Sequence, residues 1–266
     1  VEIGEGVTRF HPGARVIATF VPDWIGGAWA PTPGSYGRGM AVQGVLATEI
    51  VAGEDELVAA PAHLSFEEAA TLPCAAVTAW SALCAGASPL PGESVLVQGS
   101  GGVSMFALQF ARLFGQHIIA TSSTPTKLKL IQKLGAHDLV DYRAIPDWEL
   151  PVLAATGGMG VDRTVEIGGA ATFAKSIAAT RAGGRIAVVG LLTGAPAPGA
   201  ELFMRGLTLY PIRVGSRQDF EAMNRAISWH CLQPVIDRLF DFDEAVPAMK
   251  YLEQGQHVGK IVIRVQ

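Results

Sequence analysis

The sequence predicts an α/β protein whose centre is a doubly wound parallel sheet, enclosed by a β-rich unit that both chain ends build. Three observations support this prediction. The β-branched run Ser94–Gln98 ends in a glycine cluster, and an apolar helix pattern follows at once. From there onward strand and helix patterns alternate, which is typical of a parallel sheet covered by helices. The flanking parts instead hold short β-like runs between loops rich in proline and glycine.

The glycine cluster is the most informative motif of the chain. It reads Gly99-Ser100-Gly101-Gly102-Val103-Ser104 and joins the strand to the helix. Glycines permit a tight turn and close approach of the backbone, while the N–H groups and the dipole of a helix start attract a pyrophosphate. Ser104 replaces the third glycine of the usual fingerprint, so the motif alone is a weak signal. Its interpretation depends on the elements around it.

The rest of the central block continues the alternation. A helix at Val103–Phe114 is followed by a strand at His117–Thr121. Thr124 can cap the next helix, with Pro125 at its first position and Gly135 just past its end. The remaining predicted elements are strands at Leu139–Val140, Val161–Ile167, Arg185–Val189 and Leu207–Val214, and a helix at Ala170–Thr180.

The two chain ends have a different pattern. Residues 1–62 show no convincing helix, and the first helix starts at a capping box formed by Ser65 and Glu68. The other patterns are β-like runs at Arg15–Phe20 and Gly44–Val51, amphipathic helices at Asp219–His230 and Asp243–Gln254, and a closing strand at Lys260–Val265. We therefore expect a nucleotide-binding domain over residues 81–216 inside a second domain made of residues 1–80 and 217–266.

Composition excludes several classes of protein. The 266 residues are 49% apolar and 17% charged, which suffices for a sizeable core. The net charge of -4 provides no basic footprint for nucleic acid. No apolar run approaches the roughly 18 residues that span a bilayer, so no membrane partner is expected. The first residues lack the basic and apolar regions of a signal peptide.

The cysteines and histidines predict neither disulfides nor a metal site. Cys74, Cys84 and Cys231 are odd in number and widely spaced, without a C-x-x-C pair. This distribution fits a reducing, cytoplasmic environment. The six histidines show no spacing typical of metal ligands.

The end of the second strand indicates which dinucleotide is bound. An NAD site usually places an acidic residue there, about twenty residues beyond the first glycine, to bind the ribose hydroxyls. Here the position holds Thr121-Ser122-Ser123, Lys127 lies one helical turn on, and the next carboxylate is Asp138. Hydroxyls and a cation suit a 2′-phosphate, which a carboxylate would repel. The sequence therefore favours NADP(H) over NAD(H).

Other classes lack their own motifs. None of the four tyrosines is followed four residues later by lysine, so the dyad of short-chain reductases is absent. The chain has no G-x-S-x-G elbow and no G-K-[ST] phosphate loop. A methyltransferase would normally need an acidic residue where Ser122 and Ser123 stand.

Four ordered segments carry a family resemblance: Leu72–Trp80, Val95–Val103, Lys133–Ala136 and Gly255–Val262. Together they resemble the medium-chain dehydrogenase/reductase superfamily, and most of all its zinc-independent branch of alcohol dehydrogenase-like and quinone oxidoreductase-like proteins. The resemblance covers essentially the whole chain. It implies a Rossmann domain that binds NADP(H) and an incomplete GroES-like domain.

The resemblance also implies a set of cofactor-binding residues. Thr78 would lie near the nicotinamide, and Gly99 through Ser104 would hold the pyrophosphate. Ser122, Ser123 and Lys127 match the 2′-phosphate pocket, with Tyr142 near the adenosine end. The positions expected to contact ribose, nicotinamide and carboxamide are Ile167, Gly168, Val189, Gly190, Leu191, Ile212, Val214 and Gly215.

Cys74 matches a catalytic zinc ligand of zinc-dependent relatives, but the partners of that ligand lie nearer the N-terminus. The first residues resemble a stretch normally preceded by roughly sixty residues, whose removal would leave the edges of a GroES-like barrel unpaired. With no visible partner, Cys74 is interpreted as a small residue that packs in a helix.

The activity implied by the resemblance is hydride transfer between NADP(H) and a carbonyl, a quinone or an activated alkene or alcohol, without zinc. The cofactor carries this chemistry and the protein orients it. No histidine, tyrosine or lysine stands out as a general acid. The alternative is a catalytically inactive NADP(H)-binding remnant with a sensing or partner-binding role.

Two expectations concern partners. Trp24, Trp29 and Tyr36 either line a cleft for small apolar or aromatic substrates or cover an exposed end of the barrel. The strand within Gly206–Val214 resembles the edge strand that pairs with its twin in family dimers. We therefore expect a homodimer.

Overall fold

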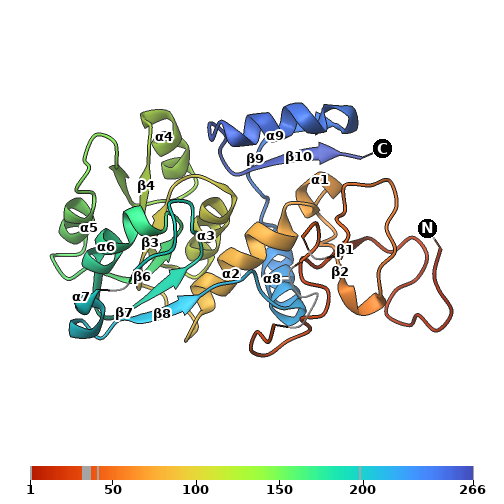
Figure 1. Cartoon of the computed structure of the whole chain (residues 1–266), viewed down its shortest axis with the longest axis horizontal. Coiled ribbons are helices and arrows are strands. Elements are labelled where there is room, and N and C mark those ends of the chain that lie inside the picture. Colours follow the sequence, from red (N-terminus) through yellow and green to blue (C-terminus); the bar gives the residue numbers. More distant parts are fainter. Residues whose placement is uncertain (1, 32–36, 41, 198, 266) are drawn as a thin grey trace. The chain divides into compact units, whose positions relative to one another are not determined.

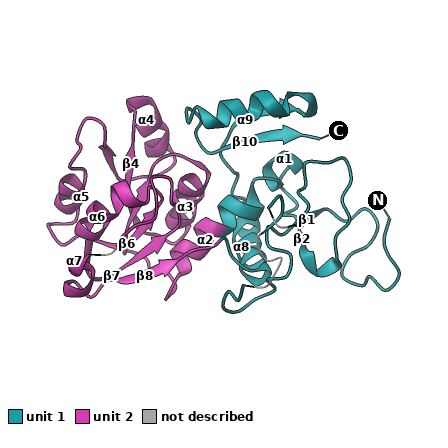
Figure 2. Cartoon of the chain, viewed as in Figure 1, with its two compact units in different colours: residues 1–77, 214–266 teal, residues 78–213 magenta. Residues whose placement is uncertain are grey.

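The computed structural model describes residues 2–31, 37–40, 42–197 and 199–265. The chain divides into two compact units, shown in different colours in Figure 2. The first unit contains residues 1–77 and 214–266, and the second contains residues 78–213. Each unit is described by itself.

The second unit is built on a six-stranded parallel sheet with the order β5-β4-β3-β6-β7-β8, seen at the left of Figure 1. The strands are β3 (Ser94–Gln98), β4 (His117–Ser122), β5 (Asp138–Asp141), β6 (Val161–Glu166), β7 (Thr180–Val188) and β8 (Thr208–Pro211). The helices are α2 (Val77–Cys84), α3 (Gly102–Leu113), α4 (Pro125–Lys133), α5 (Glu149–Ala155), α6 (Ala170–Ala179) and α7 (Ala200–Met204). The predicted α/β class with a parallel sheet is confirmed. The chain runs outward from β3 to β5 and then returns to β6 on the other side of β3, which creates a topological switch point.

Burial of β3 explains why it forms the centre of the sheet. All five of its residues are buried, as expected for a parallel strand covered on both faces. Leu96 packs in a cluster with Ile119, Val152 of α5 and Val161. Trp80 of α2 contacts Phe110 of α3 with ring centroids 5.5 Å apart. These contacts fix the helices on the sheet whose ends form the candidate site.

Several strand boundaries differ from the prediction. The strand predicted at Leu207–Val214 is limited to β8 (Thr208–Pro211), and the start of β7 differs most. The pattern placed the start of the fifth strand at Arg185, after a glycine turn, but β7 begins at Thr180. The pairing of β6 with β7 shifts register between Val161 and Arg163. Gly183 lies in this stretch with a φ of 69°, a conformation that glycine adopts readily. Gly183 and Gly184, the two glycines of the expected turn, therefore lie inside an irregular strand.

The first unit contains short strand pairs and helices. β1 (Val16–Ala18) pairs antiparallel with β2 (Leu57–Ala59), and β9 (Ile236–Asp241) pairs parallel with β10 (Lys260–Arg264). The helices are α1 (Phe66–Ala69), a π-helix at Leu72–Ala76, α8 (Arg217–Trp229) and α9 (Ala245–Glu253), with 3₁₀ turns at Glu54–Glu56 and Phe242–Glu244. The predicted capping box is confirmed, because the Ser65 hydroxyl accepts from the Glu68 N–H and the Glu68 carboxylate accepts from the Ser65 N–H.

The predicted β-like run Gly44–Val51 is wrong. The residues described there form no strand, and Val51 is fully exposed. A strand needs a hydrogen-bonded neighbour. The apolar pattern does not specify whether another segment lies alongside, and among the described residues none pairs with this run as a strand. The sequence also missed β2 and β9, whose partners lie far along the chain.

A half-buried carboxylate, that of Asp162, joins the amino ends of β3 and β6. Asp162 Oδ2 accepts from the Ser94 N–H at 2.7 Å and from the Ser94 hydroxyl at 2.8 Å, and Oδ1 accepts from Arg181 Nε at 2.6 Å. Burial by itself would raise the pKa of Asp162, but the Ser94 N–H, Arg181 and the Ser94 hydroxyl together hold its pKa below the usual value. The carboxylate therefore stabilises the fold in its ionised form.

This geometry predicts an acid-sensitive contribution to stability. Because the pKa is lowered in the fold, the stabilisation is present above the unfolded value of about 3.9 and is lost as pH falls through the folded pKa. We expect Asp162→Asn to lower the free energy of unfolding at pH 7 by about 2 kcal/mol, the usual contribution of hydrogen bonds to a charged group. Urea unfolding between pH 7 and pH 3 should then show a smaller pH dependence in the variant.

The control is Asp147→Asn, which removes an exposed carboxylate paired with Lys175 at 2.9 Å. Exposed ion pairs contribute little, so this variant should unfold like the wild type. Equal destabilisation by the two substitutions would contradict the role of Asp162.

Candidate cofactor site

The carboxyl ends of β3, β4, β6 and β7 bring most of the predicted residues together within the second unit. In open α/β sheets, ligands bind outside these ends at the switch point. Here the switch point lies between β3 and β6, which are hydrogen-bonded neighbours. The glycine cluster follows directly after β3.

The glycine turn is closed from the inside by two hydrogen bonds. Gly99 has a φ of 76°, which side chains disfavour, and its N–H donates to Thr121 O at 2.8 Å. Ser104 is 2% exposed, and its hydroxyl donates to Gln98 O at 2.6 Å. The serine that replaces the third glycine therefore ties the helix back to the strand, and Ser100 beside it is buried.

The start of α3 leaves backbone donors without a partner inside the helix. Gly101 caps the helix without a side-chain hydrogen bond, and the Met105 N–H makes the bond to Gly101 O at 3.0 Å. The N–H groups of Gly102, Val103 and Ser104 precede it and point out of the helix end. A Cβ added to Gly101 would meet nothing within 4 Å. This cradle fits a pyrophosphate, whose charge the helix dipole favours.

The end of β4 places hydroxyl groups beside this cradle. Ser122 is 1% exposed and Ser123 is half-buried. The Tyr142 N–H donates to Ser122 O at 3.1 Å, so the structure brings these predicted residues together. The Thr124 hydroxyl accepts from the Lys127 N–H at 3.3 Å, which fixes Lys127 in the first turn of α4.

The carboxylate of Asp141, at the end of β5, accepts hydrogen bonds from the turn that follows it. Asp141 pairs with Ser122 in the sheet. Its Oδ1 accepts from the N–H groups of Arg143 at 2.9 Å and Ala144 at 3.2 Å. The carboxylate is therefore engaged by backbone.

The turns after β6 and β7 interlock. Glu166 O accepts from the Val189 N–H at 2.9 Å and from the Gly190 N–H at 3.1 Å. A Cβ on Gly190 would lie 1.7 Å from Ile167 O, so only glycine fits there. The structure thus brings Ile167 and Gly168 together with Val189 and Gly190, while Leu191 is 59% exposed.

Sequence reasoning missed a buried polar network beneath these turns. The Glu166 side chain is 0% exposed and accepts from Gln98 Nε2 at 3.0 Å and from the Ser176 hydroxyl. Gln98 Oε1 in turn accepts from the Ile167 N–H at 3.1 Å. A glutamate inside the central strand predicted at Val161–Ile167 was the available signal, because a charged residue at a buried position needs partners.

Three predicted residues are not brought to this site by any described contact, and a fourth, Ile212, is joined only to the end of β7. Thr78 is buried in α2, and the Ile212 N–H donates to Val188 O at 2.9 Å, which continues the sheet. Val214 and Gly215 belong to the first unit. Val214 has a φ of 59°, which is strained for a β-branched residue. The cofactor roles of all the predicted site residues, these four included, stay predictions.

The interpretation of Cys74 as a packing residue is wrong. Cys74 is exposed in the π-helix, whereas Ala75 and Ala76 beside it are buried. In the described ranges, no group of three or more His, Cys, Asp or Glu side chains could hold a metal ion. All three cysteines lie in these ranges, and none forms a disulfide.

Two of the three aromatic residues predicted near a substrate cleft pack on each other. The rings of Trp24 and Trp29 are 5.0 Å apart and nearly edge-to-face, and Trp24 O accepts from the Arg217 N–H at the start of α8. Tyr36 lies outside the described residues. No helix of the described chain is long and apolar enough to span a membrane.

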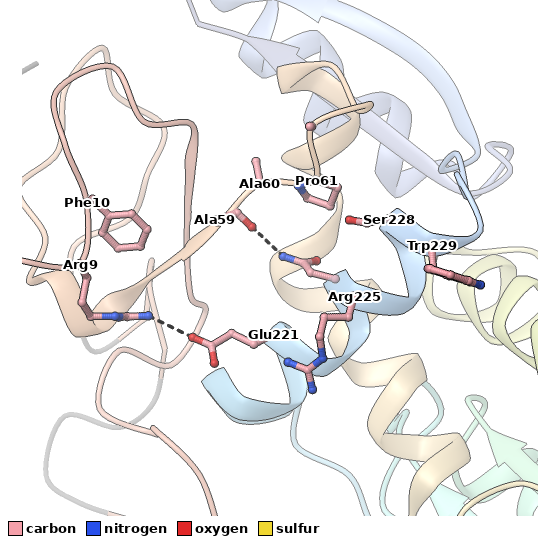
Figure 3. A pocket seen from close by; sticks show the side chains of 11 residues that line it. Arg9, Phe10, Ala59, Ala60, Pro61, Glu221, Arg225, Ser228 and Trp229 are labelled. Carbon is pink, nitrogen blue, oxygen red and sulfur yellow. Dashed lines mark hydrogen bonds and ion pairs between the residues drawn. The ribbon is translucent and has the colours of Figure 1, made fainter.

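The first unit also holds a groove of about 750 Å³ (Figure 3). Figure 3 shows the Arg9 side chain directed toward Glu221. The two form an ion pair, with Arg9 Nη2 3.0 Å from Glu221 Oε1, and Asn224 Nδ2 donates to Ala59 O at 3.0 Å. Trp229 at the rim is 85% exposed. Because none of the predicted cofactor residues lines this groove, we assign the candidate cofactor site to the sheet ends instead.

Comparisons with known proteins agree with the fold. A family model described as zinc-binding dehydrogenase matches residues 102–229. A zinc-type alcohol dehydrogenase-like protein of Schizosaccharomyces pombe is 36% identical over 99% of this chain and 79% of its own length. The crystal structure of a putative alcohol dehydrogenase from Sinorhizobium meliloti is 40% identical, with a TM-score of 0.93 over 99% of this chain and 78% of that one. The structure of an NAD-dependent alcohol dehydrogenase is 33% identical, with a TM-score of 0.89 over 99% and 79%. The chain therefore belongs to the medium-chain dehydrogenase/reductase superfamily.

Proposed function

We propose that this protein is an NADP(H)-dependent oxidoreductase that transfers a hydride to or from a carbonyl, a quinone or an activated alkene or alcohol. The observation that carries the proposal is the cradle at the switch point. There the uncapped start of α3 and the open space at Gly101 adjoin the hydroxyl-rich end of β4. The alcohol dehydrogenases among the relatives support the same reaction class.

Each part of the dinucleotide has candidate partners in the second unit. The N–H groups of Gly102 and Val103 would bind the pyrophosphate. Ser123 and Lys127 would bind the 2′-phosphate, and the interlocked turns at Ile167 and Val189 would support the nicotinamide ribose. When bound, the cofactor supplies the hydride chemistry. The protein holds it in place and excludes water.

The preference for NADP(H) rests on charge. The residues after β4 are hydroxyl-bearing, and the carboxylate of Asp141 is engaged by its own turn. Lys127, in the first turn of α4, would attract a 2′-phosphate. The carboxylate of Asp141 keeps its charge but is held by the N–H groups of its own turn. One solved relative is named as NAD-dependent, so the preference needs a direct test.

We also propose that hydride transfer proceeds without zinc and that the first unit is the GroES-like domain. Cys74 is the residue that matches a zinc ligand of zinc-dependent relatives, and the sequence shows no H-x-H or C-x-x-C spacing that would supply further ligands. Treatment with a strong chelator should leave turnover unchanged, and elemental analysis should find less than one zinc per chain.

The proposed homodimer forms through β8. This strand is the edge of the sheet, with β7 as its hydrogen-bonded neighbour. An exposed edge offers unpaired backbone groups to another strand. Thr208 is exposed on it, and two copies of Thr208→Glu would place like charges together. We expect this variant to sediment as a monomer where the wild type is a dimer, while Thr126→Glu on α4 leaves the dimer unchanged.

The test of the cofactor site fills the cradle without disturbing the fold. Gly101 has a φ of -75° and open space around its Cβ position, so Gly101→Val should fold normally. Its side chain would occupy the space of the pyrophosphate and weaken NADPH binding about a hundredfold or more, a loss of roughly 3 kcal/mol. Calorimetric titration measures the affinity, and steady-state assays with quinones, enones and aldehydes measure turnover.

The matched control is Gly199→Val. Gly199 also precedes a helix, has a φ of -90° and meets nothing within 4 Å of its Cβ position. This variant should bind NADPH like the wild type. Wild-type binding without turnover of any substrate would instead favour the inactive NADP(H)-binding remnant. Equal NADPH affinities of Gly101→Val and Gly199→Val would contradict the assignment of the pyrophosphate site to the start of α3.

A single substitution tests the dinucleotide preference. Ser123→Asp places a negative charge where the 2′-phosphate is expected, so NADPH affinity should fall at least tenfold more than NADH affinity. Ser123→Asn, which adds similar volume without charge, is the control. An unchanged ratio of the two affinities would show that the 2′-phosphate lies elsewhere.

A further inference from the structure

The Glu166 side chain is the most deeply buried charge at the switch point. It is the last residue of β6 and is 0% exposed. Its neighbours Ile167 and Gly168 are expected to lie along the nicotinamide ribose. A carboxylate in this position either stabilises the turn after β6 or exerts an electrostatic effect on the cofactor expected there.

Four donors surround the two carboxylate oxygens. Oε1 accepts from the Gly169 N–H at 2.9 Å and from the Thr172 hydroxyl at 2.5 Å. Oε2 accepts from Gln98 Nε2 at 3.0 Å and from the Ser176 hydroxyl. In all four bonds the carboxylate is the acceptor, and both of its oxygens are engaged.

Among the described residues, no lysine, arginine or histidine forms an ion pair with Glu166, so its charge has no direct cationic partner there. At the other end of β6, Asp162 differs, because Arg181 lies 2.6 Å from its carboxylate. Hydrogen bonds stabilise the Glu166 charge but do not cancel it. In a buried environment of low dielectric, the electrostatic field of this carboxylate extends further than the field of a charge at the surface.

We propose that Glu166 is a positioning residue that also favours the oxidised, positively charged nicotinamide over the neutral reduced form. This inference rests on the proposed function. When the hydride leaves C4 with its electron pair, the ring gains one positive charge, and a nearby uncompensated carboxylate stabilises that state. A bound reduced cofactor would then give up its hydride more readily to a carbonyl or quinone.

The test compares the affinities of the oxidised and reduced dinucleotide. Calorimetry with NADP⁺ and NADPH, and with NAD⁺ and NADH in parallel, gives the ratio of the two dissociation constants for the wild type and for Glu166→Gln. The amide has nearly the shape of the carboxylate but carries no charge. We expect the oxidised form to weaken about fivefold or more relative to the reduced form.

Two controls separate the charge from the fold. Ser176→Ala removes one hydrogen bond to Glu166 and keeps its charge. Asp162→Asn removes a carboxylate from the opposite end of the same strand. Both should lower stability while the ratio of affinities stays within about twofold of the wild type.

A further variant applies if Glu166→Gln does not fold. Ala171 is exposed in the first turn of α6, next to the residues that bind Glu166. Ala171→Lys would add a cation there and should also weaken the oxidised form relative to the reduced form, whereas Ala154→Lys on α5 should not.

The outcomes are distinguishable. If Glu166→Gln or, failing that, Ala171→Lys weakens both forms equally, Glu166 is only a structural clamp and the inference is overturned while the proposed function stands. If the wild type binds none of the four dinucleotides, the proposed function fails and the inference fails with it.

Discussion

The pairing of β3 with β6 is the constraint on which the candidate site depends. Two carboxylates secure it, one at each end of β6. At the amino end, Asp162 binds the backbone and hydroxyl of Ser94. At the carboxyl end, Glu166 binds the amide of Gln98, which also accepts from the Ile167 N–H. The register of these two strands places the glycine turn and the turn after β6 at the same edge of the sheet.

From this constraint the site is built outward in both directions. Toward β4, the Gly99 N–H binds Thr121 O and links the glycine turn to the hydroxyl-rich strand end. Toward β7, Glu166 O binds two N–H groups of the next turn, and the absence of a side chain on Gly190 permits that close approach. Glycine is required at these two positions for different reasons. Gly99 adopts a positive φ, whereas at Gly190 a side chain would clash with Ile167 O.

The first unit shows how apolar patterning fails without its partners. Gly44–Val51 has the composition of a strand, yet the residues described there form none. β9 has three exposed residues in succession and no alternating pattern, but it pairs in parallel with β10. In both cases the outcome depends on which backbone lies alongside, which local composition does not specify. Cys74 illustrates the same limit, because its burial depends on which side of the helix is covered.

The sequence by itself determined the α/β class, the order of the strands in the second unit, the glycine turn, the capping residues Ser65 and Thr124 and the hydroxyl-rich end of β4. These features depend on local periodicity, backbone conformation and side-chain hydrogen bonds over a few residues. Only the tertiary structure decided that Ser104 closes the turn from inside, that Asp141 is engaged by its own turn and that Glu166 lies buried beside Gln98. Some of these contacts join residues that lie far apart in the sequence, as Gln98 and Glu166 do. In the others, the backbone geometry decides which donor meets which acceptor, and the residue types do not specify that geometry. Burial then decides which of these polar groups must find a partner.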